Sequence, residues 1–111
     1  MKLKMEININ FEVDFYNVFL IFIKNKDFQF EFKYPIFKEL NEFKKELKNI
    51  IKEYKENKYF WEYNFYGILI FKKNEIWIVK ELCGTCQGIY NFKIKGSNLI
   101  LEFLNKLEFL L

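Results

Sequence analysis

Two cysteines, Cys83 and Cys86, are the residues of this chain whose spacing could support chemistry, in the segment Cys-Gly-Thr-Cys-Gln-Gly. A redox pair needs its first thiol at the start of a helix, where the helix dipole lowers the thiol pKa. Residues 88–94 instead alternate between apolar and polar side chains, as a strand does. The spacing also matches half of a zinc knuckle.

A zinc site at this pair would need further ligands. Structural zinc takes four ligands, usually Cys or His, and the chain has no histidine and only these two cysteines. Carboxylates could complete the site, or the same pair from a second copy across a two-fold axis. The interpretation that we favour is a pair of free thiols in a glycine-rich loop. We therefore expect no cofactor, with zinc shared between subunits as the alternative.

Other catalytic groups are scarce in this sequence. Without histidine, the chain lacks the side chain that most often serves as a general base near neutral pH. Its four glycines have no nucleotide-binding spacing. Carboxylates such as Glu6, Glu12 and Glu31 stand at alternating strand positions, where solvated charge is expected. We therefore expect that the protein is not an enzyme, and a redox or metal-linked enzyme centred on Cys83 and Cys86 is the alternative.

The first half of the chain predicts three strands and a helix. Residues 5–15 alternate strictly, which predicts a half-buried strand. The continuous apolar run 18–23 predicts an inner strand that is covered on both faces. Residues 28–33 alternate again. Pro35 suits the first turn of a helix, and apolar residues at helical spacing extend that helix over 36–56.

The second half predicts four strands and a second helix. Strand patterns cover residues 59–65, 68–71, 76–79 and 90–95. A helix with a leucine-rich inner face follows at 97–111. The chain therefore predicts one α+β domain over residues 1–111, in the order βββα-ββββα. Its antiparallel meander sheets have about six to seven strands, with both helices packed on one face.

The last helix has two polar residues and two apolar residues away from its inner stripe. Glu102 and Lys106 stand at i and i+4, where opposite charges pair on the outside of a helix. Leu101 and Phe109 widen the apolar surface beyond the inner stripe. This widening indicates a second covering element or a partner.

A second candidate surface follows from the aromatic segment 59–66. Alternation sends one set of rings inward and leaves Phe60 and Tyr66 on the other side. Beside Lys72 and Lys73, exposed rings could stack on single-stranded bases or anchor a protein interface. The alternative is that all these rings pack beneath the helices. With the two residues of the last helix, the candidate partner-binding set is Phe60, Tyr66, Lys72, Lys73, Leu101 and Phe109.

Charge and composition bound the cellular setting. The net charge is +3, but the chain has no arginine, the residue that binds phosphate and guanine through two parallel hydrogen bonds. Amino acids with AT-rich codons dominate, which supplies lysines and aromatic rings whether or not a partner needs them. No apolar run reaches the ~18 residues of a membrane span, and a signal-peptide pattern is absent, so we expect a cytoplasmic protein.

In size, aromatic-rich composition and α+β outline, the chain resembles small phage-type anti-CRISPR proteins of AT-rich bacteria. It also resembles contact-toxin immunity proteins. The first resemblance implies a stoichiometric complex that blocks a CRISPR effector nuclease, or its guide RNA, without turnover. We therefore expect a non-enzymatic protein-binding inhibitor, acting as a monomer or homodimer.

Two other functions remain open. An immunity protein that neutralises a bacterial toxin is one, although inhibitors of basic nucleases tend to be acidic and this chain has a pI near 8.7. A small nucleic-acid-binding module is the other, and its binding would weaken steeply with salt.

Overall fold

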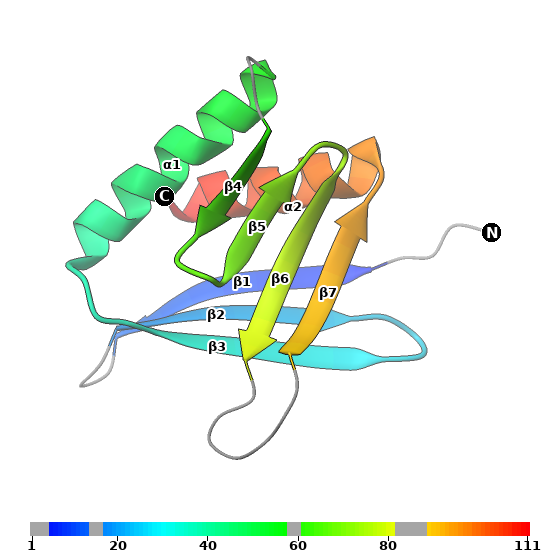
Figure 1. Cartoon of the computed structure of the whole chain (residues 1–111). Coiled ribbons are helices and arrows are strands. Elements are labelled where there is room, and N and C mark those ends of the chain that lie inside the picture. Colours follow the sequence, from blue (N-terminus) through cyan, green and yellow to red (C-terminus); the bar gives the residue numbers. More distant parts are fainter. Residues whose placement is uncertain (1–4, 14–16, 58–60, 82–88) are drawn as a thin grey trace.

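The computed structural model describes residues 5–13, 17–57, 61–81 and 89–111. Within them the chain forms two antiparallel sheets, each followed by a helix (Figure 1). This confirms the predicted α+β class and order of elements. The elements are β1 (Glu6–Val13), β2 (Asn17–Lys24), β3 (Gln29–Ile36), α1 (Leu40–Glu56), β4 (Glu62–Phe65), β5 (Leu69–Lys72), β6 (Glu75–Glu81), β7 (Ile89–Lys95) and α2 (Ser97–Leu110).

The first sheet has the order β1–β2–β3, so β2 is its central strand. Its inner face buries Phe19, Ile21 and Ile23 completely. The prediction that residues 18–23 are covered on both faces is wrong for the outer face, where Val18 and Leu20 are only partly buried. On that face the neighbouring strands carry polar and charged side chains, whose stems shield the apolar ones in place of a second layer.

The first helix begins later than predicted. Pro35 and Ile36 end β3, where Pro35 lies opposite Val18, and α1 begins at Leu40. A proline fits an edge strand where its nitrogen faces away from the ladder, because no donor is needed there. The helix ends as predicted: Asn57 adopts a left-handed φ of 53° and its N–H donates to the Glu53 and Tyr54 carbonyls.

The second sheet is a four-stranded meander, β4–β5–β6–β7. The β4–β5 hairpin turns through Tyr66 and Gly67, with φ values of 52° and 70°. The Asn64 Oδ1 atom accepts a hydrogen bond of 2.7 Å from the Gly67 N–H and holds this turn closed. Asn74, with a φ of 64°, turns the chain between β5 and β6.

One core joins both sheets and both helices. The Phe43 ring of α1 lies at its centre, 5.7 Å from the Phe19 ring of the first sheet and 5.0 Å from the Phe65 ring of the second. Both helices lie on the same side of the β1–β2–β3 sheet (Figure 1). No helix in the described part of the chain combines the length and apolar content that a bilayer crossing requires.

Candidate protein-binding groove

The candidate site is built on α2, which presents apolar side chains in two directions. Ile100, Phe103, Leu104 and Leu107 recur at helical spacing and are buried in the core. On other faces of the helix, the Leu101 side chain is 51% exposed and that of Phe109 is 90% exposed. The predicted widening of the apolar surface on this helix is therefore present, and it faces solvent.

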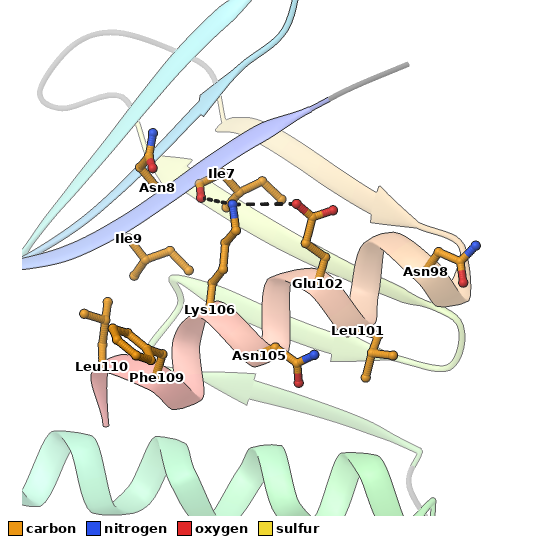
Figure 2. A pocket seen from close by; sticks show the side chains of 10 residues that line it. All are labelled: Ile7, Asn8, Ile9, Asn98, Leu101, Glu102, Asn105, Lys106, Phe109 and Leu110. Carbon is orange, nitrogen blue, oxygen red and sulfur yellow. Dashed lines mark hydrogen bonds and ion pairs between the residues drawn. The ribbon is translucent and has the colours of Figure 1, made fainter. Parts of the chain in front are cut away.

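A groove of about 740 Å³ lies between α2 and β1 (Figure 2). The strand contributes Ile7, Asn8 and Ile9. The helix contributes Asn98, Leu101, Glu102, Asn105, Lys106, Phe109 and Leu110. The two exposed apolar residues of α2 thus share one hollow with an edge strand of the first sheet.

Lys106 joins the two walls of the groove. Its Nζ atom donates a hydrogen bond of 2.7 Å to the main-chain oxygen of Ile7, and it lies 3.6 Å from the Glu102 carboxylate (Figure 2). The predicted ion pair at i and i+4 is confirmed. The bond to Ile7 shows in addition that this carbonyl points away from β2, toward the open edge of the sheet.

Main-chain groups of β1 therefore face the groove in a regular pattern. In an antiparallel ladder, both polar groups of one residue point to the partner strand and those of the next residue point away. The Ile7 oxygen accepts from Lys106, and the Phe11 N–H donates to Asn10 Oδ1 over 2.9 Å. Ile9 lies between them with the same orientation. Among the described residues, nothing bonds its outward N–H and carbonyl.

Tyr66, another predicted partner-binding residue, lies away from this groove. Its ring contacts the Phe43 and Phe65 rings, with centroids 6.1 Å and 4.8 Å away. Its hydroxyl accepts a hydrogen bond of 2.6 Å from Lys38 Nζ and donates to the Glu46 carboxylate. Tyr66 is 52% exposed, but these contacts hold it in place.

Lys38 and Tyr66 of this cluster line an apolar pocket of about 420 Å³ together with Phe37. The hydrogen bond to Glu46, and then the bond to Tyr66, raise the pKa of the Lys38 ammonium. The bond from Lys38 lowers the pKa of the Glu46 carboxyl. Both groups are therefore held in their charged forms and are bonded to each other and to the Tyr66 hydroxyl. We interpret the cluster as a clamp between α1, the segment before it and the β4–β5 turn.

Lys72 and Lys73, also predicted to bind a partner, lie at the β5–β6 turn. Lys72 packs its ammonium 4.4 Å from the centroid of the Trp77 ring, and Lys93 approaches the same ring to 4.2 Å. Such contacts stabilise an exposed sheet face. With two ammonium groups over it, the indole ring is already occupied, so stacking on a nucleic-acid base would have to displace a lysine. Lys73 is exposed.

Three predicted site residues, Phe60, Cys83 and Cys86, lie outside the described residues, so their roles stay predictions. Comparison of the chain with protein-family models, curated proteins and solved structures gives no match.

The sequence did not indicate the contribution of Ile7, Ile9 and Lys106 to this groove. Alternation assigned the two isoleucines to the core, and their side chains do point inward. The groove uses their main chain instead, and that role depends on which strand lies at the edge of the sheet. A signal was nevertheless present: two apolar residues off the inner stripe of a helix need a surface beside them.

Proposed function

We propose that this protein acts without catalysis, by binding another protein stoichiometrically through the α2–β1 groove. The observation that carries this proposal is the pair of exposed apolar side chains, Leu101 and Phe109, beside an unpaired strand edge. Exposed aromatic rings lose hydration at little entropic cost when a partner covers them, and this makes them common anchors of interfaces.

The charged groups at the groove support protein as the ligand. Lys106 and Glu102 pair with each other, so the lining has no excess of positive charge. Nucleic acid would require a concentration of cations there. An apolar groove with a few main-chain donors and acceptors fits a polypeptide instead.

Inhibition is the form of binding that we propose, and a CRISPR effector nuclease is the first partner class to test. The resemblance of the chain to small anti-CRISPR inhibitors supports this choice. An inhibitor of this kind would cover a functional surface of its target, and its effect would saturate at a fixed molar ratio. A toxin neutralised by an immunity protein is the alternative partner.

The experiment compares two phenylalanines that are both 90% exposed, Phe109 in the groove and Phe37 on another surface. Wild type, Phe109→Ser and Phe37→Ser are titrated into effector cleavage reactions and used as bait in pull-downs from the native host. We expect Phe109→Ser to weaken inhibition and capture at least tenfold, as loss of a central aromatic anchor does. Phe37→Ser should behave as wild type. Equal loss in both variants, or measurable substrate turnover by the pure protein, would contradict the proposal.

A further inference from the structure

We propose that the partner supplies an extended segment that adds to β1 as a fourth strand of the first sheet. This inference rests on the proposed function and specifies how the partner is held. Strand addition draws affinity from main-chain hydrogen bonds and specificity from alternate side chains. Free main-chain groups and an apolar surface for side chains are both present at β1.

The main-chain part is the row of outward groups from Ile7 to Phe11. Ile9 offers an N–H and a carbonyl that no described residue bonds, at the centre of this row. On either side, the Ile7 oxygen is capped by Lys106 and the Phe11 N–H by Asn10. These caps come from side chains that can rotate away. They protect the edge from unspecific pairing in the free protein and can release it to a partner.

The side-chain part is the surface of α2 beside this edge (Figure 2). Leu101 and Phe109 are eight positions apart in the sequence, which is about 12 Å along a helix axis. Residues i and i+4 of a strand, which point to the same face, are about 13 Å apart. An added strand can therefore place two bulky apolar side chains over these two residues while its main chain bonds β1.

The opposite edge of the same sheet, on β3, has a break in its row of outward donors at Pro35. Pairing alternates, and the β3 residues in line with Pro35 point outward. Proline has no N–H to donate there. This missing donor favours β1 over β3 as the edge to which a strand adds.

Charge on β1 defines the partner segment further. Glu6 and Glu12 are exposed near the two ends of the outer face of β1, and neither forms an ion pair with another described residue. Polar Asn8 and Asn10 lie between them. The complementary segment carries Lys or Arg opposite each glutamate, polar residues between, and apolar residues at the alternate positions. Its basic residues are six positions apart.

The same charges disfavour a second copy of this chain as the occupant. If two β1 strands paired over their full length across a two-fold axis, Glu6 of each copy would lie opposite Glu12 of the other. Like charges directly opposite each other destabilise a strand pair. The occupant that we infer is therefore a basic-flanked segment of a different protein.

A synthetic peptide tests this inference without the natural partner. The probe is acetylated, amidated and fluorescently labelled Lys-Val-Thr-Ile-Thr-Val-Lys, which places its lysines opposite Glu12 and Glu6 in an antiparallel register. Binding is measured by fluorescence polarisation at low salt, because salt screens exposed charges. We expect saturable binding by the full chain. N-methylation of the central peptide isoleucine should weaken binding about tenfold, since it removes one main-chain hydrogen bond and adds a clash.

A charge exchange provides the matched control. The double variant Glu6→Lys with Glu12→Lys should bind the lysine peptide roughly three- to tenfold less tightly. It should gain affinity for the same peptide with glutamates at both ends. Two results would overturn strand addition. One is that the double variant binds the lysine-ended and glutamate-ended peptides equally well, and the other is that the wild type binds the N-methylated and unmodified peptides equally well.

Failure of this inference can be told apart from failure of the proposed function. Ile9→Pro removes the outward N–H, and natural-partner capture by this variant is compared with capture by Phe109→Ser. Loss of capture in both, with wild-type circular dichroism, supports strand addition. Loss in Phe109→Ser alone supports protein binding but overturns strand addition. Dimerisation of the wild type in light scattering, abolished by Ile9→Pro, would assign the edge to a second copy and also overturn it.

Discussion

The Nζ atom of Lys106 lies 2.7 Å from the main-chain oxygen of Ile7, and this bond joins α2 to the edge of β1 across 99 positions in the sequence. It places the exposed apolar residues of α2 beside unpaired main-chain groups of β1. One side chain thereby joins the two walls of the groove and caps a main-chain oxygen of the strand edge.

Replacement of Lys106 by methionine tests this bond. Lys106→Met keeps an apolar stem of similar length and removes the ammonium, so we expect the free energy of unfolding to fall by about 1 kcal/mol. Urea denaturation measures this change. Lys45→Met on α1 is the control, because Lys45 is exposed and contacts no described partner through its ammonium. A larger loss in the control would show that the Lys106 bond does not stabilise the fold.

Phe43 should be the most sensitive position of the core. Phe43→Ala removes the ring that contacts both sheets and leaves a cavity, which should cost about 3–5 kcal/mol in the free energy of unfolding. Phe37→Ala, on a side chain that is 90% exposed, should change stability by less than about 0.5 kcal/mol. Guanidinium denaturation of both variants measures the difference. Similar losses would contradict the placement of Phe43 at the centre of one shared core.

The clamp of Lys38, Glu46 and Tyr66 should make the stability of the fold depend on pH. The pKa of Glu46 is lowered in the folded protein, so its contribution is present above the unfolded pKa and is lost as pH falls through the folded pKa. We expect Glu46→Gln to have a lower melting temperature than wild type at pH 7. The difference should shrink at pH 3. A gap that is constant between the two pH values would assign the loss to a cause other than the ionised carboxylate.

Tyr34 should make the stability of the fold decline at alkaline pH. Its hydroxyl donates a hydrogen bond of 2.6 Å to the Val79 carbonyl. Burial raises the pKa of this phenol. Because the folded pKa lies above the unfolded value near 10, the contribution of Tyr34 is complete below that pH and is lost as pH rises further. Tyr34→Phe should therefore cost about 1 kcal/mol at neutral pH and show a shallower decline above pH 10. Parallel declines in both proteins, followed by circular dichroism, would contradict this role.

Periodicity predicted most of this fold because each element has one clearly apolar face. The strict alternation before residue 13 and the helical spacing in 97–110 each allow one orientation toward the core. The prediction for Pro35 was wrong because proline suits both the start of a helix and an outward position on an edge strand. The choice between these depends on whether β3 lies at the edge of its sheet, which local sequence does not encode.

The candidate site was only partly predictable for a similar reason. Leu101 and Phe109 could be identified from the sequence because they are apolar residues outside the inner stripe of their helix. Tyr66 stood out equally, but its hydroxyl and ring are engaged by Lys38, Glu46 and Phe43, residues at least 20 positions away. The free main chain of Ile9 is invisible in sequence, because every residue carries the same N–H and carbonyl and only sheet topology leaves them unpaired.

Amide hydrogen exchange at Ile9, followed by NMR with and without saturating Lys-Val-Thr-Ile-Thr-Val-Lys peptide, tests the central claim most directly. In the free protein, the Ile9 amide should exchange much faster than the amide of Ile21 in the central strand, since only the latter lies within a completed ladder. On binding, the Ile9 amide should become protected. Saturation that leaves Ile9 exchange unchanged, or slow exchange at Ile9 in the free protein, would contradict strand addition at β1.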